Sequence, residues 1–323
     1  MNAPEPDAPK KPSNTNVTGI VLMMLGAALL TAMDGTVKLL VMKDFSPFQI
    51  LAVRGWIIFV LMAAWILPRE GLDALKTKRW GWHLGRSVIG FAAPFLFFLS
   101  FRALPLADAT VIFFGATFIM TAASALFLKE RVGAHRWAAV FIGFTGVVIA
   151  ANPGTGVFQV EALYALCASV TYAFLVLSAR WIGDTEPTFR MVFYYNLGLM
   201  VIATLVLPFV YKPMSMEDLG IILAISILAF SGHICLTRAF VVAPVGVIAP
   251  FEYTSLIWAA LFGFVLFADI PAPNVWIGAA VIVMCGLYVI ARERRSAKIA
   301  SAAIAGTDPI AVPMIAPEDD VRN

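Results

Sequence analysis

The chain alternates long apolar stretches with short polar connections. Five stretches contain no Asp, Glu, Lys or Arg, and they cover residues 109–128, 137–160, 162–179, 191–211 and 270–291. Each is close to the ~20 residues that an α-helix needs to cross the hydrocarbon core of a bilayer. Because backbone groups in lipid must form their hydrogen bonds within the segment, these stretches are predicted to be membrane-spanning helices.

Hydropathy and the turn residues in the connections together predict ten membrane-spanning helices. They are expected near residues 18–41, 46–67, 84–103, 107–128, 136–151, 161–181, 189–211, 217–240, 245–268 and 274–292. No connection is long enough to hold a separate domain. Residues 1–17 and 293–323 are expected to be disordered tails on the cytoplasmic side. The predicted fold class is an all-α membrane protein.

The composition excludes several classes of protein. Hydrophobic residues make up 61% of the 323 positions and charged residues 13%, which is too little charge to cover the surface of a soluble domain. The net charge of +3 gives no reason to expect a nucleic-acid partner. The sequence has no phosphate-binding loop of the form G-x-x-x-x-G-K-[ST] and no cluster of metal-ligating residues, so neither a cofactor nor a metal is predicted. An enzyme is not expected.

Basic residues predict the orientation. With the N-terminus inside, the basic residues of the inner face are Lys10, Lys11, Arg69, Lys76, Lys78, Arg79, Lys129, Arg131, Arg136, Arg180, Arg190, Arg238, Arg292, Arg294, Arg295 and Lys298. The outer face receives only Lys43, Arg102 and Lys212. Since positive charge accumulates on the cytoplasmic side, both termini are expected in the cytoplasm of a bacterium, with the helices in its inner membrane.

The two halves of the chain resemble each other. Matching landmarks occur in the same order in each half, and they are the pairs Arg102 and Arg238, Glu130 and Asp269, and Trp137 and Trp276. The repeats are expected to cover residues 18–151 and 161–292. Five helices per repeat is an odd number, so the second repeat is predicted to be inverted relative to the first. Inverted repeats are typical of secondary transporters, which bind their substrate between the halves.

These motifs resemble the drug/metabolite transporter superfamily, in the ten-span group built from paired EamA-type domains. The resemblance rests on Pro47 with Arg54 in the second span, on the segment 107–112 in the fourth, on the segment 249–253 in the ninth and on the acid Asp269 followed closely by Pro271. It implies a transporter of two inverted repeats. The Phe-Glu-Tyr form of the ninth-span motif, together with Asp34, resembles a subset that includes riboflavin importers.

Three charged residues in the first two spans are candidates for ion coupling or gating, because ionisable groups at membrane depth are costly and tend to be functional. Asp34 and Lys38 lie one helical turn apart, and we expect them to form a pair, which would be equally compatible with a purely structural role. Arg54 lies in the middle of its span and is expected to face a cavity or to find an acidic partner.

Three more acidic residues stand out beyond the first two spans. Glu252 follows Pro250 and has no basic neighbour within a turn, so it is a candidate to carry a proton or to contact substrate. The acids Glu130 and Asp269, near span ends, are expected instead to cap helices or to pair locally.

Hydroxyl and aromatic residues suggest a substrate cavity. Thr110, Phe114, Thr117 and Thr121 form one stripe along the fourth span. Tyr194 in the seventh span, and Tyr253 and Trp258 in the ninth, are the other candidates for contact with substrate. A planar ring that stacks and accepts a few hydrogen bonds would suit such a cavity, although Phe is abundant in any membrane protein.

The function predicted from the sequence is secondary transport of a small molecule by alternating access. Import of a planar vitamin such as riboflavin is the specific hypothesis, and export of amino acids or toxic metabolites is the alternative. A lipid-modifying membrane enzyme would need clustered acids or histidines near one membrane surface, which the sequence lacks. The expected partners are the substrate, the lipid bilayer and, in a homodimer, a second copy of the chain.

Overall fold

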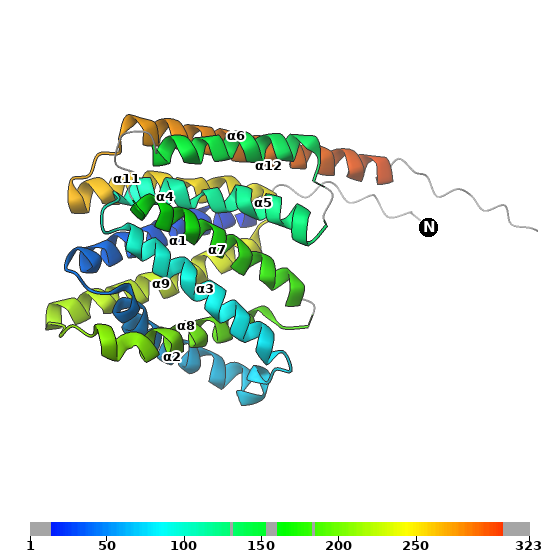
Figure 1. Ribbon diagram of the computed structural model, residues 1–323. Helices are drawn as coiled ribbons and strands as arrows, with labels where there is room; N and C mark the ends of the chain where they lie inside the picture. Colours follow the sequence, from blue (N-terminus) through cyan, green and yellow to red (C-terminus); the bar gives the residue numbers. More distant parts are fainter. Residues whose placement is uncertain (1–13, 130–131, 153–159, 183–184, 306–323) are drawn as a thin grey trace, which may run out of the picture.

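The computed structural model describes residues 14–129, 132–152, 160–182 and 185–305, where the secondary structure is helical (Figure 1). Within these ranges, ten helical spans are long and apolar enough to cross a membrane, which confirms the number predicted from the sequence. Large apolar side chains such as Leu205 and Phe209 lie exposed on the outside of the bundle, as a surface in contact with lipid requires.

The described part of the first repeat contains six α-helices and one short 3-10 helix. They are α1 (Asn14–Met42), α2 (Pro47–Glu70), η1 (Leu72–Leu75), α3 (Trp80–Ser100), α4 (Leu106–Phe113), α5 (Gly115–Phe127) and α6 (Ala134–Ala151). Helices α4 and α5 together form the fourth span. Helix α1 begins at Asn14, so residues 14–17, which were expected to belong to the N-terminal tail, are helical.

The second repeat has a matching order. Its elements are α7 (Val160–Ile182), α8 (Thr188–Val210), α9 (Met216–Val242), α10 (Val245–Ile248), η2 (Ala249–Tyr253), α11 (Thr254–Phe267) and α12 (Pro273–Ala305). The last helix continues beyond the membrane span to Ala305, so the prediction of a disordered tail from residue 293 was wrong for residues 293–305. Good helix formers such as Ala, Arg and Lys dominate that extension.

The helices pack as two inverted repeats. Exchanging the two halves converts the contact between α1 and α9 into the contact between α7 and α3, and both contacts are extensive. The same exchange leaves the pairs α2 with α8 and α6 with α12 in contact with each other. These two self-related pairs lie at opposite edges of the bundle (Figure 1). The predicted fold class of two inverted five-helix repeats is confirmed.

Small residues allow the closest helix crossings. A Cβ atom added to Gly278 of α12 would lie 2.5 Å from the carbonyl oxygen of Gly146 on α6. Gly26 of α1 and Gly232 of α9 make a similar crossing, since a Cβ on Gly26 would lie 3.1 Å from the carbonyl oxygen of Gly232. Close approach of this kind is the main source of packing energy between helices in lipid.

Two equivalent spans are interrupted near their middle, whereas each was expected to be a continuous helix. The fourth span breaks at Phe114, between α4 and α5. The ninth span tightens into the 3-10 helix η2, which contains Pro250, a residue that cannot donate a backbone hydrogen bond. Phe114 and Tyr253 are separated by the same interval as Trp137 and Trp276, so the two interruptions lie at equivalent positions.

Candidate substrate and coupling site

A cavity of about 320 Å³ lies between the two repeats. Helices α1 to α5 line it from the first repeat, and α7, α8, α9, η2 and α11 line it from the second. Its walls combine an aromatic lining with four side chains that can carry charge, namely Asp34, Arg54, His233 and Glu252. This volume is within the range of pockets that bind small molecules. We call it the central cavity.

Three of the four candidates for ion coupling or gating line the central cavity, and the fourth does not. Asp34 comes from α1, Arg54 from α2 and Glu252 from η2. Among the described residues, none of these three side chains makes an ion pair. The expected pair of Asp34 with Lys38 is not formed, because Lys38 Nζ lies 2.7 Å from Asp269 Oδ2.

Lys38 and Asp269 form an ion pair between distant parts of the chain. The sequence had suggested that each would pair with a residue close to it in the chain. Asp269 follows the end of α11 and pairs with a residue of the first helix, so its predicted local pairing was wrong. Lys38 also lies 4.5 Å from the centre of the Phe267 ring. The equivalent of Asp269 in the first repeat, Glu130, lies outside the described residues.

A second ion-paired contact lies near the first, at the end of the bundle opposite the start of α1 and the end of α12 (Figure 1). Lys43 Nζ is 2.9 Å from both Glu217 Oε1 and Asp218 Oδ1 at the start of α9. Hydrogen bonds to Asp218 and to Glu217 raise the pKa of Lys43. Gln49 of α2 donates a hydrogen bond to the carbonyl oxygen of Lys212 and accepts one from its backbone N–H. This end of the bundle is therefore held together by contacts between the two repeats.

The predicted stripe on the fourth span does face the cavities. Thr110, Phe114 and Thr117 line the central cavity, and Thr121 lines a second cavity beside it. The hydroxyl of Thr110 donates to the Leu106 carbonyl, and that of Thr121 donates to the Thr117 carbonyl. The hydroxyl of Thr117 makes no hydrogen bond to another described residue, so it remains available to a ligand.

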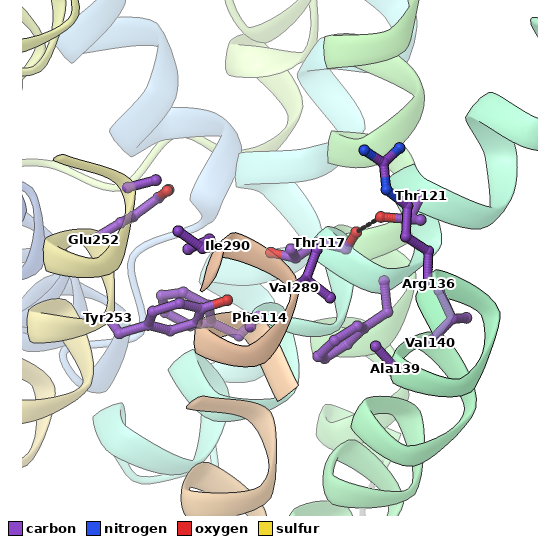
Figure 2. A pocket seen from close by; sticks show the side chains of 13 residues that line it. Phe114, Thr117, Thr121, Arg136, Ala139, Val140, Glu252, Tyr253, Val289 and Ile290 are labelled. Atoms are coloured by element: carbon purple, nitrogen blue, oxygen red, sulfur yellow. Dashed lines mark hydrogen bonds between the residues drawn. The ribbon is translucent and has the colours of Figure 1, made fainter. Parts of the chain in front are cut away.

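The second cavity has a volume of about 170 Å³ and meets the central cavity at Phe114, Thr117 and Glu252. Figure 2 shows Glu252 and Tyr253 on one side of it and Thr121 and Arg136 on the other. We call it the side cavity. Because Phe114, Thr117 and Glu252 border both spaces, a change at any of them acts on both cavities.

An aromatic pair stands where the two cavities meet. The rings of Phe114 and Tyr253 stack with their centroids 5.3 Å apart and an interplanar angle of 28°. These are the residues at which the two equivalent spans are interrupted. Gly286 of α12 provides the space for Tyr253, since a Cβ atom on Gly286 would overlap the tyrosine hydroxyl. Phe114 and Tyr253 thus form a contact between the two inverted repeats, with one residue from each.

Two aromatic candidates lie away from the central cavity. The hydroxyl of Tyr194 donates a 2.7 Å hydrogen bond to the carbonyl oxygen of Leu75, and its ring packs against Trp80 and His83. Trp258 stacks on Phe262 at 6.1 Å, and its buried indole nitrogen has no hydrogen-bond partner in the described part of the chain. Neither side chain lines the central or the side cavity.

Other residues take their place in the cavity wall. Tyr195, the neighbour of Tyr194, lines the central cavity together with Tyr172 of α7 and His233 of α9. Neighbouring residues on a helix point in directions ~100° apart. The sequence alone does not show which of Tyr194 and Tyr195 points into the cavity. Tyr172 could have been found as a polar aromatic residue in the middle of an otherwise apolar span.

Comparison with known proteins gives the same architecture. The model of the EamA-like transporter family matches residues 18–152 and, separately, residues 159–292. A protein of known crystal structure superimposes with a TM-score of 0.57 at 18% identity, covering 88% of this chain and 99% of that chain. That likeness supports the fold.

Named relatives are similar over most of their length. An S-adenosylmethionine uptake transporter of Rickettsia felis is 25% identical over 87% of this chain and 95% of its own length. A riboflavin transporter of Rhizobium johnstonii is 27% identical over 86% and 93%. A pseudopaline exporter of Pseudomonas aeruginosa is 26% identical over 83% and 94%. With ten membrane spans and two tandem matches to one family model, this chain is a multi-pass bacterial membrane protein that belongs to the EamA-like transporter family.

Proposed function

We propose that this transporter takes up a small metabolite with a planar heteroaromatic ring across the inner membrane, by alternating access and without ATP hydrolysis. The observation that carries the proposal is the central cavity between the inverted repeats, which combines aromatic walls with unpaired charged side chains. Secondary transporters of inverted repeats bind their substrates at this place.

The aromatic wall supports a ring-shaped substrate. Phe113 packs against Tyr172 with ring centroids 5.2 Å apart and against Phe97 at 4.7 Å, and all three rings line the cavity. Offset stacking on such rings adds about 0.5–1.5 kcal/mol for each pair beyond the burial of apolar area. The free hydroxyl of Thr117 and the carboxyl of Glu252 would supply hydrogen bonds to the edge of the ring.

The relatives support the same class of substrate. Riboflavin and S-adenosylmethionine both carry a planar heteroaromatic ring, and they appear in the names of two relatives, a riboflavin transporter and an S-adenosylmethionine uptake transporter. Riboflavin remains the vitamin first expected from the sequence. A pseudopaline exporter among the relatives keeps export open as the alternative direction.

Glu252 is our candidate for ion coupling. It borders both cavities, and it makes no ion pair with any described residue. A carboxyl at membrane depth is costly when charged, so binding and releasing a proton there can be linked to the exchange of substrate. The ion pairs of Lys38 with Asp269 and of Lys43 with the start of α9 are expected to break when the cavity becomes accessible from the other side of the membrane.

Uptake measurements test the proposal. Bacterial cells that lack their own carriers would express the chain and receive radiolabelled riboflavin, S-adenosylmethionine or a panel of amino acids. We expect accumulation of at least one ring compound above the level of cells that express Thr117→Trp. Export of preloaded amino acids with no uptake of any ring compound would support the alternative and contradict the proposal.

A further inference from the structure

An arginine in the middle of the second span has no hydrogen-bond or ion-pair partner among the residues that the structure describes. Arg54 exposes only 9% of its surface, yet it lines the central cavity. It makes no hydrogen bond and no ion pair with any residue that the structure describes. A guanidinium carries five N–H donors and keeps its charge at any physiological pH, so burial without an acceptor is unfavourable. Such a group is expected to bind an acceptor that enters the cavity.

Among the acids of the cavity wall, Asp34 is the one that interacts electrostatically with Arg54. The two side chains interact electrostatically across the cavity, but they are too far apart to form an ion pair. Lys38, one turn further along α1, is already paired with Asp269 and does not neutralise Asp34. An acid and a base on adjacent helices therefore face the same space without contacting each other.

The polar groups around Asp34 and Arg54 do not supply the missing hydrogen-bond partners. The hydroxyl of Tyr195, which lies near Arg54, is directed to the Gly90 carbonyl at 3.5 Å. The hydroxyl of Thr31, one turn before Asp34, donates to the Ala27 carbonyl of its own helix. His233 lies on the α9 side of the cavity and is subject to the positive charge of Arg54. None of these groups supplies an acceptor to the guanidinium.

We propose that Asp34 and Arg54 bind the zwitterionic α-amino-acid headgroup of the substrate, with its carboxylate on Arg54 and its ammonium group on Asp34. A carboxylate matches the two parallel N–H donors of a guanidinium, and these charge-assisted hydrogen bonds are stronger than neutral ones. The ring of the same substrate lies toward Phe114 and Tyr172. This inference rests on the proposed function and narrows its substrate class to ring compounds that carry an amino-acid group, which S-adenosylmethionine has and riboflavin lacks.

Ligand competition on the purified full-length protein in nanodiscs tests the headgroup site without any mutation. Labelled S-adenosylmethionine is the probe. S-adenosylhomocysteine retains the headgroup and should compete well, whereas 5′-methylthioadenosine keeps the ring and lacks the headgroup. We expect the latter to bind roughly 10–100-fold more weakly, since charged hydrogen bonds of this strength are lost with the headgroup.

Variants assign the effect to the two side chains. In Arg54→Gln and in Asp34→Asn, the affinity for S-adenosylmethionine should fall by the same factor while that for 5′-methylthioadenosine stays unchanged. Arg102→Gln and Asp44→Asn are matched controls at exposed positions outside the cavity, and they should bind both ligands as the wild type does. Arg54→Lys, which keeps the charge but not the paired donors, should retain part of the preference.

The outcomes separate the two hypotheses. Equal binding of the two adenosine compounds by the wild type, or tight binding of riboflavin that Arg54→Gln leaves intact, would overturn the headgroup site and leave the proposed function standing. An Arg54→Gln variant that weakens both ligands equally would also overturn it, because the effect would then be structural. If no ring compound binds at all, the proposed function fails and this inference fails with it.

Discussion

The two interrupted spans have the same place in the fold but different chemistry. The fourth span breaks at one residue, Phe114, and Thr110 and Thr121 on either side of it donate their hydroxyls to their own helix backbone, whereas Thr117 does not. The ninth span breaks over the whole of η2, and it presents a carboxyl, Glu252, to both cavities. Figure 2 shows the two meeting at Phe114 and Tyr253.

This difference indicates how an inverted repeat becomes a selective transporter. Symmetric packing allows the two halves to exchange conformations, which alternating access requires. A substrate with a ring at one end and polar groups at the other has no twofold symmetry, so its binding groups must differ between the halves. We therefore expect changes in the fourth span to act mainly through space and changes in the ninth mainly through charge.

The inverted arrangement itself predicts an all-or-none result. Reporter fusions at residue 73 and at the C-terminus should both be cytoplasmic, and a fusion after Lys212 should be periplasmic. The physical reason is that five spans, an odd number, separate equivalent points of the two repeats. Such points must therefore lie on opposite sides of the membrane. A periplasmic C-terminus would mean an odd number of spans, and the comparison between the two interrupted helices would then have no basis.

Filling the fourth span tests the role of space. Thr117→Trp places bulk where the two cavities meet, so we expect transport to fall at least about tenfold, a change that needs only ~1.4 kcal/mol of lost binding. Uptake of labelled substrate and the amount of protein in the membrane would both be measured. Thr145→Trp is the matched control, because Thr145 is exposed on the outside of α6. Normal transport by both variants would reduce the stripe to a packing feature.

Removing the charge of the ninth span tests coupling. Glu252→Gln keeps the shape and the hydrogen-bonding capacity of the side chain but cannot gain or lose a proton. If Glu252 carries the coupled proton, uphill accumulation should stop while counterflow of labelled for unlabelled substrate continues. Glu161→Gln at the start of α7 is the matched control.

Two other results would change the role assigned to Glu252. A parallel fall of accumulation and counterflow in Glu252→Gln would indicate that Glu252 binds substrate and does not couple. Full accumulation with unchanged pH dependence would remove Glu252 from the mechanism, and Asp34 would be the next acid to test.

The fold could be predicted from the sequence because lipid permits few solutions. Uncharged stretches of sufficient length must form helices, and the basic residues predict on which side of the membrane each connection lies. The interruption at η2 had a local signal in Pro250, which removes a backbone donor. The interruption at Phe114 had none, and it became visible only as the equivalent of Tyr253.

The candidate site was less predictable because it depends on contacts between distant residues. Asp34 and Lys38 have the spacing of a helical pair, yet Lys38 pairs with Asp269 at the other end of the chain. Tyr194 and Tyr195 differ only in how α8 is rotated in the bundle, and packing against α2 and α3 decides that rotation. Thr117, Glu252 and Arg54, which line the central cavity, were selected from the sequence because polar and charged groups at membrane depth are costly.

The smallest predicted effect concerns the contact that joins the two interruptions. A Cβ atom on Gly286 would overlap the hydroxyl of Tyr253, so Gly286→Ala should push Tyr253 from its stack on Phe114. Overpacking of this kind costs roughly 1–3 kcal/mol, and we expect lower thermal stability together with a transport rate reduced only a few-fold. Thermal unfolding and initial uptake rates would measure the two effects.

A second substitution distinguishes this contact from general damage to α12. Tyr253→Leu removes the ring that Gly286→Ala would strike, so the double variant should be less impaired than the sum of the two single variants. Gly220→Ala is the matched control, because a Cβ atom at Gly220 would meet nothing within 4 Å. Additive losses in the double variant would mean that Gly286 acts through α12 itself, and the stacked pair would then be a consequence of helix packing with no part in connecting the two halves.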